Sequence, residues 1–208
     1  MMGRRASLIM VAALFFGCDR SSSDVVELRE EAPLAASPSP VPPGPHVGAI
    51  AEAERDAEPA ADARLEAVGG RPIAGAVRLY ETEAGVRIIV TVERAQEGLY
   101  GVHVHEKGDC SDPKQGSMGA HFAPSSHEHA LPSEGGDRHL GDLGNIEVGA
   151  DGSGRLELTV PSATLRPGDA RSFLGKAAVL HEQADMGRRS QPAGGSGLPI
   201  ACGVIEPG

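Results

Sequence analysis

The sequence predicts an all-β domain, an antiparallel sandwich or barrel, that begins near residue 69. Three observations support this: short runs rich in Val, Ile and Leu follow one another, turn residues separate them, and no long helical period competes. The runs are IAGAVRLY, GVRIIVTVE, LYGVHVHE, GNIEVG, GRLELTV and GKAAVLHE. Many short strands joined by Gly-rich turns are typical of antiparallel sandwiches and barrels.

The connections between these runs fall into two kinds. ADGSG, between IEV and RLELTV, is typical of a β-hairpin turn, and RPGDA marks a second reversal. Two longer segments, Lys107 to Gly141 and Glu182 to Pro199, have no strand pattern of their own. Loops of that length in a compact domain are usually functional or disordered, so we expect function to lie there.

The first residues read as an export signal. Two arginines precede the apolar run Leu8–Phe16, which is too short to span a bilayer, and the small residue Gly17 stands just before Cys18. This junction resembles the lipobox of bacterial lipoproteins, whose cysteine becomes lipid-modified. Phe15 stands where such boxes usually carry Leu, which leaves simple cleavage or an uncleaved anchor as alternatives. We expect residues 1–18 to be a signal peptide with Cys18 as the candidate lipidation site.

Residues 19–68 are predicted to be a disordered tether. The stretch is rich in Ala, Pro, Ser and Glu, as in APLAASPSPVPPGP, and has almost no aromatic or β-branched periodicity. A transient helix is conceivable over 47–67, but its apolar positions are mostly Ala and would bury little surface. The expected organisation is therefore 1–18 signal peptide, 19–68 tether and 69–208 β-domain.

Net charge excludes one class of partner. The formal charge is −10, and the chain has neither a basic stripe nor an aromatic platform on which bases could stack. We therefore expect no nucleic-acid partner. Any attraction of a small anion must come from the local field around a site rather than from the overall charge.

Most of the eight histidines fall between positions 103 and 181. His103 and His105 lie two apart in a strand run, so the period of two places both on one face, where neighbouring imidazoles can chelate a metal. The pair alone is weak evidence, because ordinary core or surface histidines would give the same pattern.

Other potential ligands accompany this pair. His121, His129, His139 and Asp142 lie in the first long segment, and His181 ends a separate strand run. Three imidazoles and one carboxylate form a donor set suited to zinc. The remaining histidines offer an all-nitrogen set suited to copper. The sequence therefore predicts two metal sites.

These residues stand in motifs that resemble those of one family. GVHVHEKGDC, GAHF followed by His129, RHLGDLGN, VLHE and IACGVI are similar, in order over residues 73–206, to the signatures of copper/zinc superoxide dismutases. The resemblance implies an eight-stranded Greek-key β-barrel whose two long loops roof a copper and zinc site. It also implies conversion of superoxide to dioxygen and hydrogen peroxide by alternate reduction and oxidation of copper.

The resemblance also implies a role for each matching residue. Copper would be held by His103, His105, His121 and His181, and zinc by His121, His129, His139 and Asp142. His121 would bridge the two metals and carry the catalytic proton. Asp185 would orient ligand histidines at both metals, and Cys110 and Cys202 match the family's intrasubunit disulfide. His46 and His127 match no family ligand and are expected to be exposed, with His127 a fallback zinc ligand.

The chain departs from the family at one position. Three residues before the second cysteine the family has an arginine that attracts superoxide, whereas this sequence has Pro199. Proline supplies neither charge nor donors, so anion capture is expected to weaken while metal binding need not. Arg188 and Arg189, in the adjacent loop, form a hypothetical substitute if they lean toward the channel.

Two functions follow from these expectations. The first is a superoxide dismutase that protects the cell envelope; the second is a dismutase-like copper and zinc binding protein with little turnover, favoured by Pro199. A purely structural sandwich would leave the ligand-type residues in family order by accident, and we reject it. The expected partners are superoxide and, through lipid on Cys18, a membrane. The expected location is the periplasm or cell surface, as a monomer or a homodimer.

Overall fold

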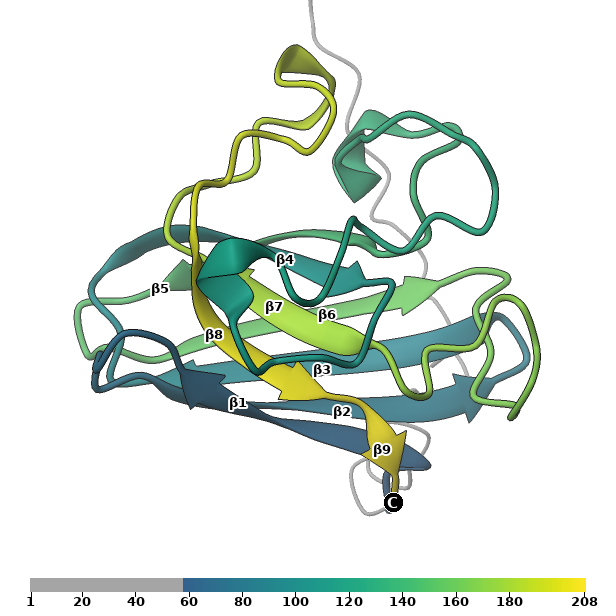
Figure 1. Ribbon diagram of the computed structural model, residues 1–208, viewed down its shortest axis with the longest axis horizontal. Coiled ribbons are helices and arrows are strands. Elements are labelled where there is room, and N and C mark those ends of the chain that lie inside the picture. The colour runs from purple at the N-terminus through teal and green to yellow at the C-terminus, as the bar shows by residue number, and fades with distance from the viewer. Residues whose placement is uncertain (1–57) are drawn as a thin grey trace, which may run out of the picture. The chain divides into compact units, whose positions relative to one another are not determined.

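The computed structural model describes residues 58–208 (Figure 1). The predicted signal peptide, Cys18, His46 and the tether as far as residue 57 lie outside the described residues. Within 58–208, none of the helical turns has the length and hydrophobicity needed to carry the chain through a bilayer.

Strands and three short 3₁₀ turns make up the regular structure. The strands are β1 (Ala61–Ala67), β2 (Ala74–Thr82), β3 (Gly85–Glu93), β4 (Gly98–His105), β5 (Asp142–Val148), β6 (Gly154–Val160), β7 (Ala177–His181), β8 (Pro199–Val204) and β9 (Glu206–Pro207). The 3₁₀ turns are η1 (Pro113–Gln115), η2 (Pro132–Glu134) and η3 (Gly187–Arg189).

The first eight strands close into an antiparallel barrel. The strand order is β2-β3-β6-β5-β4-β7-β8-β1-β9, and a further pairing of β1 with β2 joins the two ends of the series. The short β9 pairs with β1 and lies outside the ring of eight. The step from β3 to β6 skips two strands in sequence, as in a Greek key. The predicted eight-stranded β-barrel is confirmed.

Strand β1 corrects the predicted tether boundary. Residues 61–67, which sequence analysis assigned to the tether, pair with β2 and with β8. Ala61, Ala63 and Leu65 are buried, and the polar residues between them are exposed. This alternation is the signature of a strand, but two of its three buried positions are Ala, whose small side chain gives only a weak hydrophobic signal in the sequence. The β-domain therefore begins before residue 69.

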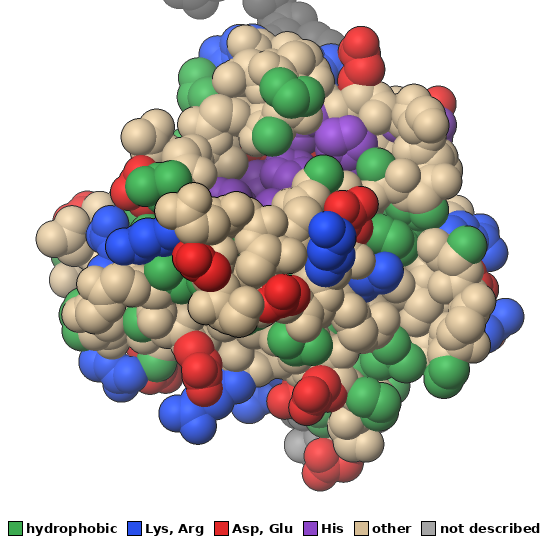
Figure 2. All heavy atoms as spheres, in the orientation of Figure 1, with side chains coloured by type: hydrophobic (Ala, Val, Ile, Leu, Met, Phe, Trp, Pro, Cys, Tyr) green, Lys and Arg blue, Asp and Glu red, His purple; other side chains and the backbone are tan. Residues whose placement is uncertain are grey.

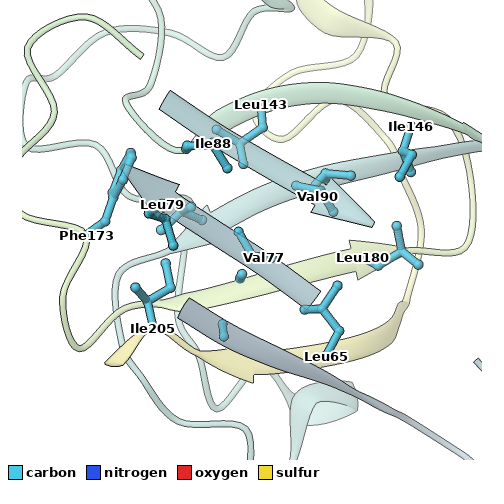
Figure 3. Close-up of a cluster of buried hydrophobic side chains, with 14 of the residues drawn as sticks. Leu65, Val77, Leu79, Ile88, Val90, Leu143, Ile146, Phe173, Leu180 and Ile205 are labelled. Atoms are coloured by element: carbon cyan, nitrogen blue, oxygen red, sulfur yellow. The ribbon is translucent and has the colours of Figure 1, made fainter. Parts of the chain in front are cut away.

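The core lies inside the barrel and comes from alternate residues of each strand. In β3, Val86, Ile88, Val90 and Val92 are almost fully buried. Val90 and Ile88 pair with Val77 and Leu79 of the neighbouring strand β2, and Ile146 of β5 belongs to the same core (Figure 3). Because side chains alternate between the two faces of a strand, the intervening residues of the long runs point away from this core.

The two predicted turns are present. In the β5–β6 connection, Gly149 N donates to Ser153 O at 2.9 Å, and Ser153 N donates to the Asp151 carboxylate at 3.0 Å. In the second reversal, Asp169 N donates to Arg166 O at 3.2 Å. These backbone and side-chain bonds replace the strand ladder where the chain reverses.

Neither long segment contributes more than an isolated bridge and 3₁₀ turns to the regular structure, apart from Pro199, which begins β8. The first segment contains η1 and η2, and the second contains η3. Figure 1 shows η2 and η3 standing above the barrel on the same side. The two loops therefore enclose one region outside the barrel wall.

Leucine-to-alanine substitutions test the place of β1 in the fold. Leu65 in β1 is 2% exposed, whereas Leu99 in β4 is 52% exposed. We expect Leu65→Ala to lower the free energy of unfolding by about 2 to 5 kcal/mol, because it removes buried methyl groups and leaves a cavity. The matched variant Leu99→Ala should cost less than about 1 kcal/mol. Urea denaturation of the two variants measures the difference, and equal costs would contradict the assignment of β1 to the core.

Candidate metal centre

Strand β4 places two imidazoles on the outer face of the barrel. Val102 and Val104 point into the core, so His103 and His105, which alternate with them, point outward. Both histidines are nevertheless buried, at 0% and 6% exposure, because the two long loops cover this part of the wall. Burial of outward-facing histidines is the first structural sign of a site.

The first ligand group consists of four imidazoles. His103, His105, His121 and His181 come from β4, the first long loop and β7, and each offers a ring nitrogen within 4.8 Å of the others. His105 Nε2 lies 3.4 Å from His181 Nε2. Their Nδ1 atoms donate to Gly119 O at 2.8 Å and Gly197 O at 3.1 Å. With the protons held on Nδ1, two Nε2 lone pairs face each other in a buried space, an arrangement that a bound cation would stabilise.

The second ligand group converges on one carboxylate oxygen. Asp142 Oδ1 lies 2.9 Å from His121 Nδ1, 2.9 Å from His129 Nδ1 and 3.3 Å from His139 Nδ1. The other oxygen, Oδ2, accepts hydrogen bonds from the backbone N–H groups of Ala130 and His139. The loop backbone thus turns Oδ1 toward the rings. Neighbouring ligand atoms around a tetrahedral zinc ion are roughly 3.3 Å apart, close to these separations.

His139 stands at the edge of this second group. Ligand atoms of His103, His121, His129 and Asp142 all lie within 4.8 Å of one another, and His139 is not a member of that set. The rings of His103 and His121 are stacked, with centroids 3.9 Å apart, which brings His103 close to both groups. His139 is also the least buried of the ring donors, with 15% of its side chain exposed.

Asp185 is hydrogen-bonded to one ring of each group. Its carboxylate accepts hydrogen bonds from His103 Nε2 at 2.9 Å and His129 Nε2 at 2.8 Å. Asn145 in β5 holds the Asp185 backbone, donating Nδ2 to its carbonyl at 3.0 Å and accepting its N–H at 2.7 Å. The predictions did not include Asn145, although it ends the RHLGDLGN motif. Asp185 therefore fixes the orientation of one ring in each group.

Burial and hydrogen bonding set the protonation states. Burial lowers the pKa of His105 to about 3 and of His181 to about 4, and it holds the pKa of His103 well below its usual range. Burial alone would lower the pKa of His129 as well, but the carboxylates of Asp142 and Asp185 beside its ring raise it to about 9. Three of the four imidazoles in the first group are therefore neutral near pH 7, as metal ligands must be.

The two aspartates are held in the ionised form. Burial would raise the pKa of Asp142, but the imidazoles of His121, His129 and His139 beside it lower it far below its ordinary value. The pKa of Asp185 is also lowered, because the bonds from His103 and His129 outweigh burial. Two buried negative charges therefore lie among the imidazoles and would attract a cation.

Unpaired ring nitrogens complete the evidence for metal binding. His103 Nδ1, His129 Nδ1 and His139 Nδ1 are buried and make no hydrogen bond of proper geometry, even though Asp142 Oδ1 lies close to the last two. A buried polar atom without a partner is costly unless something else satisfies it. The all-nitrogen group fits copper, and the group of three imidazoles and a carboxylate fits zinc.

The first group opens into a pocket between the two loops. The pocket has a volume of about 510 Å³; His105, His121 and His181 lie at it, and Pro192 and Ala193 come from the second loop. Figure 2 shows histidine side chains at the bottom of a hollow in the surface. Among residues 58–208, no Lys, Arg, Asp or Glu lines this pocket. A small molecule can therefore reach the first group without meeting a charged side chain.

The structure contradicts the hypothesis that arginines of the second loop lean toward this pocket. Arg188 Nη2 instead donates to Gly135 O at 3.1 Å and to Asp137 O at 3.0 Å, and neither Arg188 nor Arg189 lines the pocket. Backbone carbonyls of the first loop compete successfully for the guanidinium. Pro199 is buried where β8 begins, paired with His181.

His127 lies in neither ligand group. It is exposed, as predicted, and its Nδ1 donates to Arg138 O at 3.4 Å. His129, two residues further on, occupies the buried position beside Asp142 instead. The fallback role of His127 as a zinc ligand finds no support in this arrangement.

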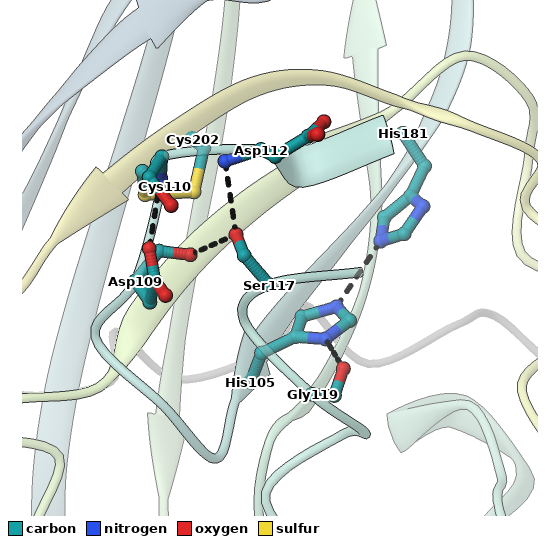
Figure 4. Close-up of a disulfide and its surroundings, with 9 residues drawn as sticks. His105, Asp109, Cys110, Asp112, Ser117, Gly119, His181 and Cys202 are labelled. Carbon is teal, nitrogen blue, oxygen red and sulfur yellow. Dashed lines mark hydrogen bonds between the residues drawn. A yellow bond between two sulfur atoms is a disulfide. The ribbon is translucent and has the colours of Figure 1, made fainter. Parts of the chain in front are cut away.

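A disulfide fixes the first loop to the barrel. Cys110 and Cys202 are bonded, as predicted, across a sequence separation of 92, and this joins the loop to β8 (Figure 4). Met118 belongs to the small hydrophobic cluster that surrounds this disulfide. Ser117 Oγ donates to Asp109 O at 2.6 Å and accepts from Asp112 N at 3.2 Å. The loop segment that leads to His121 is thereby held at its base.

Removal of this bond should destabilise the protein. We expect the double variant Cys110→Ala/Cys202→Ala to lose about 4 to 5 kcal/mol of unfolding free energy, because the unfolded chain regains the freedom of a long closed loop. Guanidinium denaturation of the metal-free protein gives the value. The parent protein under reducing conditions is the control and should fall to the same stability. A loss below about 1 kcal/mol would contradict the expectation.

Comparisons with known proteins agree with this geometry. Residues 73–205 match the family described as copper/zinc superoxide dismutase. The chain is 36% identical over 149 residues to the extracellular superoxide dismutase of Haemonchus contortus, covering 68% of this chain and 79% of that protein. It is 35% identical over 136 residues to the superoxide dismutase-like protein YojM of Bacillus subtilis, covering 63% and 68%. The crystal structure of the clock protein EA4 superposes with a TM-score of 0.63 at 31% identity, covering 72% and 96%.

Proposed function

This chain belongs to the copper/zinc superoxide dismutase family, and from that premise we propose that it converts superoxide to dioxygen and hydrogen peroxide. The observation that carries the proposal is the shared position of His121. Its ring belongs to the four-imidazole group, while its Nδ1 lies 2.9 Å from Asp142 Oδ1 in the second group. One side chain therefore joins an all-nitrogen site to a site suited to zinc.

The proposed ligand assignment follows the two groups. His103, His105, His121 and His181 would hold copper, and His121, His129, His139 and Asp142 would hold zinc. The unpaired Nδ1 atoms of His103, His129 and His139 support this division, since each would gain a partner. Copper, when bound, supplies the electron chemistry by accepting one electron from one superoxide and giving it to the next.

The protein's own residues would manage protons and access. Two superoxide anions and two protons yield one dioxygen and one hydrogen peroxide. We assign one proton to Nε2 of His121, which would take it up and release it as peroxide forms, while Nδ1 stays turned to Asp142. The Gly119 and Gly197 carbonyls hold His105 and His181 with Nε2 toward the site, which preserves the ligand geometry.

We also propose an extracytoplasmic location. The Cys110–Cys202 disulfide supports it, because such bonds persist in oxidising compartments, and the Haemonchus contortus relative is named an extracellular enzyme. Removal of the signal peptide 1–18 and lipid attachment at Cys18 would place the enzyme at the membrane, in the periplasm or on the cell surface, where it would remove superoxide from the envelope.

A second function is favoured by one observation. In the part of the chain that the structure describes, no Lys or Arg lines the pocket above the four imidazoles, and Pro199 stands where the family carries an arginine. A chain that binds copper and zinc without guiding anions to them would be a metal-binding protein with little dismutase activity. One relative, from Bacillus subtilis, bears the name superoxide dismutase-like protein.

Restoring the charge separates the two functions. We expect the purified protein loaded with copper and zinc to dismutate superoxide, and Pro199→Arg to raise the rate constant and make it fall more steeply with ionic strength. Pro199→Gln is the matched control, similar in length but without charge. The measurement is superoxide decay at several ionic strengths, with metal content quantified. If all three proteins bind both metals and none turns over, the metal-binding function is correct.

The role of Asp185 gives a further prediction. Asp185→Asn should weaken metal binding by about 10- to 100-fold. His103 and His129 each donate to a different oxygen of the carboxylate, and the amide of asparagine keeps only one oxygen to accept them. Asp137→Asn, which changes an exposed carboxylate of the first loop, is the control. Competition with a coloured chelator reports both affinities. Equal metal affinity in the two variants would remove Asp185 from the proposed site.

A further inference from the structure

Two exposed charged residues, Glu134 in η2 and Arg188 in η3, connect the two long loops. The Glu134 carboxylate accepts Leu131 N at 2.8 Å within its own loop, and it also accepts Arg188 N at 3.0 Å from the other loop. In return, Arg188 Nη2 donates to the carbonyls of Gly135 and Asp137. The second loop therefore supplies the donors and the first loop the acceptors of this connection, which we call the loop clasp.

Gly187 allows this close approach. Its φ is 60°, and a Cβ at this position would collide with the Glu134 carboxylate. A glycine is therefore required for two reasons, the left-handed backbone and the space occupied by the carboxylate. Gly187 N also donates to Asp185 Oδ1 at 2.7 Å. Arg188 of the clasp therefore directly follows Gly187, whose backbone N–H is bonded to Asp185.

On the other side, the clasp lies between two histidines of the second ligand group. Glu134 stands midway along the chain between His129 and His139. In a second contact between the loops, Gln191 Nε2 donates to the backbone carbonyl of His129 at 2.7 Å. Bonds from the backbone N–H groups of Leu131 and Arg188 lower the pKa of Glu134, so its carboxylate is ionised at neutral pH. The clasp therefore spans the segment that carries both rings.

Arg189 makes none of the hydrogen bonds of its neighbour, although the charges of both arginines lower the pKa of Glu134. Both arginines are exposed and lie in η3, yet no hydrogen bond or ion pair links the Arg189 guanidinium to another residue within 58–208. The two positions therefore share sequence context, exposure and charge but differ in whether they bridge the loops. This makes Arg189 a matched control for Arg188.

We propose that Arg188 is a positioning residue. With Glu134 it holds the two loops in register, so that His129 and His139 of the second ligand group, and Asp185 which bonds His129, keep their positions. This rests on the proposed function only as far as the assignment of that group to zinc. The guanidinium acts on loop carbonyls, so Arg188 does not guide anions to the pocket.

The test compares Arg188→Ala with Arg189→Ala in the full chain. We expect zinc to pass to a chelator at least about tenfold faster from Arg188→Ala than from the parent, with Arg189→Ala unchanged. With Co²⁺ bound in place of zinc, Arg188→Ala should show an altered visible absorption spectrum, because the ligand geometry relaxes. Both readouts are independent of superoxide turnover, so an inactive parent protein would refute the proposed function and leave this proposal standing.

Further variants guard against a loss of folding. Glu134→Ala should also speed zinc release, because it removes the carboxylate that accepts Arg188 N, whereas Arg188→Ala removes the guanidinium bonds to Gly135 O and Asp137 O of the same clasp. Urea denaturation of the metal-free variants shows whether the barrel is intact; if Arg188→Ala does not fold, Glu134→Gln is compared with the exposed control Glu128→Gln in its place. Equal zinc release from the Arg188 and Arg189 variants would overturn the proposal. So would a change in ionic-strength dependence of superoxide decay confined to Arg188→Ala with unaltered zinc release.

Discussion

The structure depends on the burial of several imidazoles beside two ionised carboxylates. Asp142 gathers Nδ1 of His121, His129 and His139, and Asp185 binds the far nitrogens of His103 and His129. Each carboxylate is costly to bury alone, and each is stabilised by the rings around it. In the first group, the Nε2 atoms of His105 and His181 face each other, and a bound cation would stabilise that arrangement.

The rest of the fold serves this arrangement. The barrel supplies a rigid wall from which His103, His105 and His181 project, and its interior core is separate from the site. The loops supply the other ligands, and three kinds of link hold the loops in place: the Cys110–Cys202 disulfide, the pair formed by Asn145 and the Asp185 backbone, and hydrogen bonds from one loop to the other. Rigid ligands on strands are thus combined with loop ligands that are fixed one by one.

Sequence reasoning found the parts of the fold that have a strong local signal. The runs rich in Val and Ile gave the strands, and His103 and His105 fell on one face because strand alternation is strict. It missed β1, whose buried positions are mostly alanine, and Asn145, whose side chain acts through a backbone 40 residues away. It also misjudged Arg188, because a short sequence pattern does not reveal which carbonyls of another loop will lie within reach of a guanidinium.

Strand β1 has a mechanical consequence. It is the first strand of the described chain, and it is hydrogen-bonded to β2 along one edge and to β8 and β9 along the other. A pull along the strand axis from its N-terminal end would be shared among the bonds of these ladders rather than opening them one by one. A force applied to the chain before residue 58 would therefore reach β1 first and pass to β2, β8 and β9 through these ladders.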